Sequence, residues 1–163
     1  MDVVTFCVCA GLPRPSSYTG RLLTPPALIA EGRCGLATRR QHGADAELVT
    51  LDTVPAGLGT DTALIEALVA QRRAESCRRL WLTMTNDNIS ALRFYQRRGF
   101  RLAQVRPGAV DAARALKPSI PAIGAHGIPM RDELDLCRVV DAGTADGVPV
   151  LPPWSRAPAG GSA

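Results

Sequence analysis

The fold of this chain is decided by one stretch, residues 88–100, which has the sequence NISALRFYQRRGF. Its spacing predicts a helix on which Asn88, Ala91 and Tyr95 share one face, because offsets of three and four residues return to the same side. Gly99 is placed where a left-handed residue commonly ends a helix, and a strand is predicted to follow. A capped helix with Tyr95 as a plain core aromatic is the alternative interpretation.

A second informative stretch, residues 54–64, has the sequence VPAGLGTDTAL and joins a predicted strand to an amphipathic helix. Its glycines let backbone N–H groups approach a phosphate closely, and the dipole at the start of a helix favours negative charge there. Tight turns use the same residues for steric reasons, so turn and phosphate loop remain equal interpretations. Thr60 or Asp61 is predicted to cap the helix with a side-chain oxygen.

Hydrophobic periodicity predicts the remaining elements around these two stretches. The predicted strands are Val3–Cys9, Ala27–Ala30, Gly35–Arg39, Ala46–Val54, Arg79–Thr83, Phe100–Val105 and Glu133–Val140. The predicted helices run from Thr62 to about Glu75, over Ser90–Arg98 and over Val110–Leu116. The last strand is expected to alternate Leu134, Leu136 and Val140 on one face with Asp135, Cys137 and Val139 on the other. An antiparallel meander followed by a strand–helix–strand crossover indicates a mixed α/β (α+β) fold.

Composition bounds the organisation of the 163 residues. We expect an irregular segment over 1–26, one domain over 27–140, and a tail rich in Pro, Gly and Ala over 141–163. No apolar run approaches the roughly 18 residues that span a bilayer, and the first residues lack a basic signal region, so we expect a cytoplasmic protein without a membrane partner.

The charged residues and the cysteines exclude several classes of site. The net charge of +4 comes almost wholly from arginine, which favours anionic ligands, and the arginines of residues 72–101 are expected to be mostly solvated. Aromatic residues make up only 4%, so a nucleic-acid partner is not expected. The five cysteines form no CxxC pair, which favours free, mostly buried thiols and no metal site.

Residues 88–100 resemble the N-x-x-A-x-x-x-Y-x-x-x-G-F signature of the GNAT superfamily of N-acetyltransferases. The order of predicted elements agrees over about residues 27–140, and residues 80–100, 127–129 and 131–133 resemble one bacterial subgroup. The resemblance implies a mostly antiparallel sheet whose central strands splay apart near Val54 and Thr83, where acetyl-CoA binds. It implies transfer of an acetyl group to a primary amine by direct attack on the thioester.

The same resemblance implies a role for individual residues. Backbone groups of Thr53 and Val54 would bind the pantetheine arm. Asn88 would contact the coenzyme, and Tyr95 would lie near the sulfur and protonate the leaving thiolate. The diphosphate would bind to N–H groups of Gly57, Leu58, Gly59, Thr60, Asp61 and Thr62.

The base that takes the amine's proton is predicted on the strand before the loop. Glu47 and Asp52 are the candidates, and strict alternation along a strand puts them on opposite faces, so only one can serve. We favour Glu47. The acceptor stays open among a protein amino terminus, lysine, an aminoglycoside, a polyamine and small amines.

Two departures from the family pattern lead to further expectations. Ala56 replaces a basic or amide residue, and the carboxylate of Asp61 would repel a diphosphate, so we expect weakened CoA binding. Only about 26 residues precede the predicted meander, which indicates a truncated or misassigned start, a half-built acceptor site, and a homodimer as one way to cover it. The alternative functions are a degenerate protein that binds CoA without catalysis and a nucleotide-binding βαβ module. The βαβ interpretation is weakened because Thr62 stands where a third glycine would be.

Overall fold

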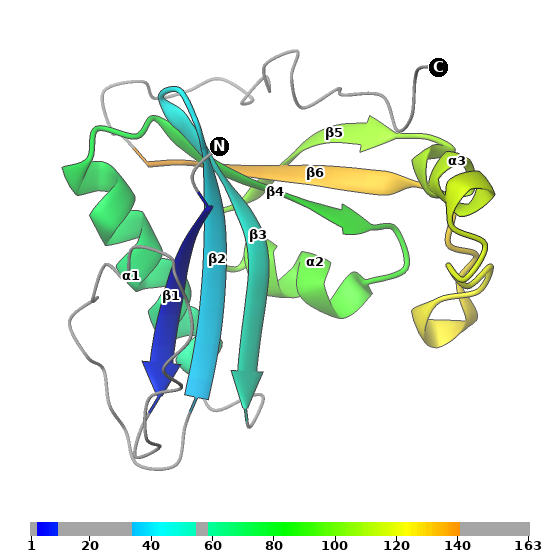
Figure 1. Ribbon diagram of the computed structural model, residues 1–163, viewed down its shortest axis with the longest axis horizontal. Helices are drawn as coiled ribbons and strands as arrows, with labels where there is room; N and C mark the ends of the chain where they lie inside the picture. The colour runs from blue at the N-terminus through cyan, green and yellow to red at the C-terminus, as the bar shows by residue number, and fades with distance from the viewer. Residues whose placement is uncertain (1–2, 10–33, 55–58, 141–163) are drawn as a thin grey trace. The chain divides into compact units, whose positions relative to one another are not determined.

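A computed structural model describes residues 3–9, 34–54 and 59–140 (Figure 1). Its strands are β1 (Val3–Cys9), β2 (Cys34–His42), β3 (Asp45–Val54), β4 (Arg79–Thr85), β5 (Arg101–Arg106) and β6 (Glu133–Val139). Its helices are α1 (Thr60–Ala74), α2 (Ile89–Gln96) and α3 (Ala109–Leu116), with a 3₁₀ turn at Ala125–Gly127. The described residues form two compact units that divide within β4, between Leu80 and Trp81, and Val140 belongs to the first. None of the helices in these residues has both the length and the apolar character that crossing a bilayer requires.

The first unit is an antiparallel meander in the order β1-β2-β3, with α1 packed on β2 and β3. Leu64, Ile65 and Leu68 of α1 are buried, as helical spacing of apolar residues requires. Gly35 lets the helix approach β2 closely, because a Cβ atom there would lie 2.6 Å from Leu64 Cδ1. The buried face of the meander is therefore the one that α1 covers.

A β-bulge interrupts the ladder between β2 and β3. Thr38 pairs with Thr50 and Arg39 with Leu48, so Val49 is an extra residue on β3 without a cross-strand partner in this ladder. The side chains of Val49 and Thr50 are both exposed. A bulge of this kind shifts the alternation of side chains by one residue along the bulged strand.

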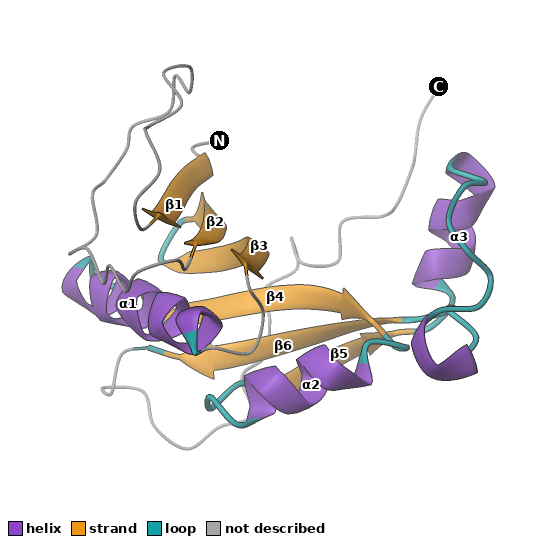
Figure 2. Ribbon diagram, turned by 90° about the horizontal axis from the view of Figure 1, so that it is seen from below, coloured by secondary structure: helices purple, strands orange, loops and turns teal. Residues whose placement is uncertain are grey.

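The second unit contains strands in the order β4-β6-β5, with α2 running alongside them on one side (Figure 2). β5 and β6 pair antiparallel, also with a register shift, between Leu102 and Gln104. β6 lies between β4 and β5, and its consecutive residues Asp135, Leu136 and Cys137 are all buried. Because consecutive residues of a strand point to opposite faces, both faces of β6 are buried at these positions.

The described elements confirm most of the predicted order and shift its boundaries. β2 extends to His42, beyond the predicted end at Arg39, and the hairpin turn is confined to Gly43 and Ala44, with Gly43 at φ +59°. β4 extends to Thr85, and the 3₁₀ turn was not predicted. The predicted strand Ala27–Ala30 lies outside the described residues. Val3–Cys9 does form a strand, so the segment 1–26 is not wholly irregular.

Most arginines of residues 72–101 are exposed or half-buried, as expected, and Arg72 is an exception. Arg72 is fully buried, donates to Gln41 Oε1 at 2.9 Å, and is paired with Glu75. Arg39 is also buried, and burial lowers the pKa of its guanidinium, with the nearby Arg72 charge acting in the same direction. These arginines are therefore structural groups of the first unit. Cys77 and Cys137 are buried thiols, as predicted.

Candidate functional site

The start of α1 carries the part of the predicted coenzyme loop that is described. Gly59 adopts φ +82°, a left-handed conformation that favours glycine, and it is the N-cap residue without a side-chain cap. The prediction that Thr60 or Asp61 caps the helix is wrong, because both lie inside its first turn. Gly57 and Leu58, like Ala56, lie outside the described residues.

The Asp61 carboxylate is hydrogen-bonded to one of the backbone N–H groups that were predicted to bind the diphosphate. Its Oδ1 accepts a hydrogen bond from the backbone N–H of Thr62 at 2.8 Å. The first helical bond is from Ala63 N to Gly59 O, so the N–H groups of residues 60–62 fall outside the helical ladder. The site therefore has the donors that an anion needs, together with a carboxylate that competes for one of them.

The end of β3 lies close to the start of α1. Thr53 pairs with Gly35, and Val54 pairs with Cys34. A Cβ atom on Gly35 would lie 3.2 Å from Thr53 Cγ2 and 3.1 Å from Thr60 Cγ2. The first unit thus brings together two of the predicted coenzyme-binding residues, Thr53 and Thr60.

Asn88 is the N-cap residue of α2. Its Oδ1 accepts a hydrogen bond from Ala91 N at 3.1 Å, which satisfies one of the free N–H groups of the first turn. The carboxamide oxygen is thereby engaged, and the amide nitrogen is the part of the side chain that can donate to a ligand. Gly99, at φ +81°, has the left-handed conformation predicted for the end of this helix.

Tyr95 lies on α2, seven residues after Asn88. Its ring makes edge contacts with Phe94, at a centroid distance of 5.0 Å, and with Phe100, at 5.4 Å. Phe100 is buried, whereas Tyr95 is only half-buried. A sealed core position for Tyr95 is therefore not what the structure shows, because the residue is only half-buried while two aromatic rings contact its ring.

The two candidate bases lie on the same face of β3, contrary to the prediction. Glu47 pairs with Arg40 and Asp52 with Leu36, two positions of the regular strand β2 that share a face. The extra residue at Val49 shifts the alternation and so turns Asp52 to the side of Glu47. Strict alternation failed here because the bulge has no mark in the sequence of the strand.

The surroundings of the two carboxylates differ. Glu47 Oε2 lies 3.2 Å from Arg40 Nη1 and 3.2 Å from His42 Nε2, and the Glu47 side chain is 17% exposed. Asp52 is exposed and has no charged partner among the described residues. Of the two, Glu47 is the carboxylate whose position is fixed by other side chains.

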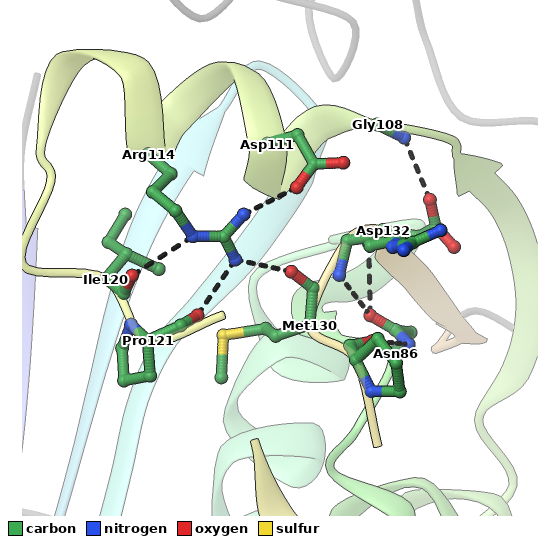
Figure 3. A network of polar contacts seen from close by, with 10 residues as sticks. Asn86, Gly108, Asp111, Arg114, Ile120, Pro121, Met130 and Asp132 are labelled. Atoms are coloured by element: carbon green, nitrogen blue, oxygen red, sulfur yellow. Dashed lines mark hydrogen bonds and ion pairs between the residues drawn. The ribbon is translucent and has the colours of Figure 1, made fainter. Parts of the chain in front are cut away.

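Asn86 and Asp87 connect the turn before α2 to residues 124–132 through hydrogen bonds. The sequence analysis did not predict these contacts. Asn86 Oδ1 accepts from the N–H groups of Arg131 and Asp132, both at 3.0 Å. Figure 3 shows Asn86 beside Asp132, together with the neighbouring contacts of Arg114, whose guanidinium donates to the carbonyl oxygens of Ile120, Pro121 and Met130.

Asp87 is buried and accepts from Ala125 N at 2.8 Å through Oδ2. A hydrogen bond from the Thr85 side chain holds the pKa of the Asp87 carboxyl below its ordinary value, and the Ala125 N–H and the His126 charge act in the same direction against burial. Gly124 is required beside it, because a Cβ atom there would lie 2.1 Å from Asp87 Oδ2. These contacts fix the backbone that leads into Asn88.

Comparison with known proteins identifies the class to which this arrangement belongs. Residues 34–100 match the model of the acetyltransferase (GNAT) family. The chain is also 40% identical over 107 residues to the uncharacterized protein YdhI of Bacillus subtilis, covering 66% of this chain and 67% of that protein. The chain belongs to the GNAT family of acetyltransferases.

Solved structures agree on the fold. A Bacillus subtilis acetyltransferase in complex with CoA matches with a TM-score of 0.56 and 18% identity, over 64% of this chain and 68% of that one. A GNAT family acetyltransferase from Elizabethkingia anophelis with acetyl-CoA bound matches with a TM-score of 0.56 and 15% identity, over 85% and 98%. The mixed α/β fold predicted from the sequence is confirmed.

Proposed function

We propose that the protein is an acetyl-CoA-dependent N-acetyltransferase that moves the acetyl group to a primary amine by direct attack on the thioester. The observation that carries the proposal is the second helix. In a chain of the GNAT family, α2 begins at a capping Asn88, carries the half-buried Tyr95, and is followed by the left-handed Gly99. A cytoplasmic location and self-association as a homodimer are parts of the same proposal.

The donor would be held chiefly by backbone groups. We assign the pantetheine arm to Thr53 and Val54 and the diphosphate to the N–H groups of residues 57–62, with Asn88 as a further contact. The left-handed Gly59 and the N–H groups outside the helical ladder fit an anion at this point. Proteins of the same fold have been solved with CoA and with acetyl-CoA bound.

The chemical step follows from the nature of a thioester. The acceptor's ammonium gives a proton to Glu47, and the neutral amine nitrogen then forms a bond to the acetyl carbonyl carbon. The tetrahedral oxyanion is stabilised by N–H donors, and its collapse breaks the bond between carbon and sulfur. The thiolate takes a proton from the Tyr95 hydroxyl, and the proton lost by the amide nitrogen restores the phenol.

Asp61 supports a second candidate function, a protein that binds CoA weakly without catalysis. Its carboxylate accepts from Thr62 N and so places negative charge among the donors assigned to the diphosphate. A nucleotide-binding module has no comparable support, because the loop has Thr62 in the position of a third glycine.

The test is acetyl-CoA-dependent release of free thiol with a panel of amines that includes peptides, lysine, aminoglycosides and polyamines. We expect turnover with at least one amine, and Tyr95→Phe should lower kcat by about 10- to 100-fold, because the lost group acts as a general acid. Tyr18→Phe removes the other tyrosine hydroxyl of the chain and is the matched control.

Absence of turnover despite measurable CoA binding would favour the binding-only function. Equal kcat in Tyr95→Phe and the unchanged protein would remove Tyr95 from the mechanism. Glu47→Gln should lower kcat more than Asp52→Asn does, since, among the described residues, charged side chains fix the position of Glu47 and not of Asp52.

A further inference from the structure

Two side chains of β2 bind the same oxygen atom of Glu47. Arg40 is the direct cross-strand partner of Glu47, and its Nη1 donates to Glu47 Oε2 at 3.2 Å. His42 lies two residues further along the same strand, on the same face, and its Nε2 is 3.2 Å from that same oxygen. Both side chains belong to the hairpin that carries Glu47.

The second oxygen of Glu47 is left for another partner. Among the residues that the structure describes, Oε1 has no hydrogen-bond partner, and the side chain keeps 17% of its surface exposed. A carboxylate held at one oxygen by two donors cannot rotate freely about its last bond. Oε1 is therefore directed by the contacts that Oε2 makes.

Besides Glu47, the hairpin places Asp45 opposite His42, and the Asp45 carboxylate has its own cationic partner. Asp45, which pairs with His42 in the hairpin, is buried and is bound by Arg79 through two hydrogen bonds, of 3.0 and 2.7 Å. The negative charge of Asp45 is thus already compensated by Arg79, and His42 Nε2 contacts Glu47 at 3.2 Å.

We propose that Arg40 and His42 are positioning residues, which fix Glu47 so that Oε1 takes the proton of the acceptor's ammonium. The inference builds on the proposed function and deepens it, because it assigns the base to Glu47 and gives the two residues that hold it. In the step itself, one N–H bond of the ammonium breaks, one O–H bond forms at Oε1, and the carboxylic acid later releases its proton to solvent.

A double-mutant cycle tests this assignment, since residues that act through one group do not add their effects. The measured quantities are kcat and the KM for acetyl-CoA in Arg40→Met, His42→Gln and Glu47→Gln, and in each double variant with Glu47→Gln. We expect Arg40→Met to lower kcat by about 10- to 100-fold, because a small misplacement of a reacting group has an effect of this size. The KM for acetyl-CoA should stay unchanged, and Glu47→Gln should mask the loss.

Controls separate positioning from damage to the fold. Arg40→Lys keeps a cationic donor and should recover most of kcat, and Arg78→Met, at an exposed arginine of the same unit, should leave kcat unchanged. Losses from Arg40→Met or His42→Gln that multiply with the loss from Glu47→Gln would overturn the inference, as would an unchanged kcat in both single variants. Absence of turnover in the unchanged protein would overturn the proposed function itself, a result distinct from both.

Discussion

Asp61 places a carboxylate in the segment that we propose binds the diphosphate of CoA. Its carboxylate occupies the N–H group of Thr62 and adds negative charge at the start of α1. Asp61→Asn should therefore tighten CoA binding by about two- to fivefold at low salt, since a charge at a helix N-terminus contributes about 0.3–1 kcal/mol. Titration calorimetry with CoA at two ionic strengths measures this, and the gain should shrink as salt rises.

Asp111 provides the matched control, because it is an acidic residue in the first turn of another helix, α3. Asp111→Asn should leave the affinity for CoA unchanged. Equal affinities of the Asp61→Asn protein and the unchanged protein would show that the carboxylate lies away from the diphosphate.

Asp87 should give the stability of the protein an acid-sensitive component. Its folded pKa is lowered, so its stabilising contribution is present above the unfolded value of about 3.9 and is lost as the pH falls through the lower folded value. Urea unfolding between pH 2.5 and pH 7 should show Asp87→Asn less stable at neutral pH, with the difference closing below about pH 4. A difference that is independent of pH would assign the stabilisation to packing alone.

Individual residues differ in how far they could be predicted. Gly99 could be predicted as left-handed, because it directly follows a helical spacing. The contact of Asp87 with Gly124 could not, since it joins residues far apart in the chain and neither lies in a periodic segment. The pairing of Glu47 with Arg40 and His42 also needed the register of the hairpin, which the sequence does not carry.

At the scale of the strands, a network of polar contacts joins β4, β5 and β6 in the second unit. Arg106 of β5 is bound to Asp135 of β6 at 2.8 Å and to Glu133 at 2.9 Å, and Thr83 of β4 donates to Asp135 at 2.6 Å. The Asp135 side chain has no exposed surface, whereas that of Glu133 is 27% exposed. The two carboxylates share one guanidinium in different surroundings.

Asp135→Asn should lower the free energy of unfolding by about 2–4 kcal/mol, because it leaves Arg106 beside a buried neutral group, and the partial exposure of Arg106 reduces the cost. Glu133→Gln should cost less than about 1 kcal/mol. Chemical denaturation of the two variants under one set of conditions compares them. Equal costs would show that burial does not decide the strength of these ion pairs.

The elements themselves were largely predictable, and their irregularities were not. Hydrophobic periods located α1, α2 and α3 to within a few residues of the observed bounds. The bulge at Val49 could not be predicted from the sequence, because no glycine or proline stands there and a bulge is defined only by the register with a partner strand. The burial of both faces of β6 was not predicted, because it depends on what packs against each face of the sheet and not on the sequence of the strand itself.

For the whole molecule, the proposed function predicts a selective response to ligands. Acetyl-CoA at 100 times its Kd should stabilise the folded chain by about 2.7 kcal/mol, which raises Tm by roughly 5–10 °C for a chain of this size. NAD at the same concentration should have no effect. A thermal-shift assay with both ligands is sufficient, and a larger shift with NAD would favour a dinucleotide-binding protein.

The β-bulge at Val49 also determines where the strand β3 can gain or lose a residue without disturbing the fold. Removing this codon would join Leu48 to Thr50 and close the ladder, while every other residue of β3 would keep its present face. Removing a codon for a paired residue of β3 would instead move every side chain on one side of the deletion to the opposite face of the sheet. Insertions and deletions among the homologues of this hairpin should therefore concentrate at this one position.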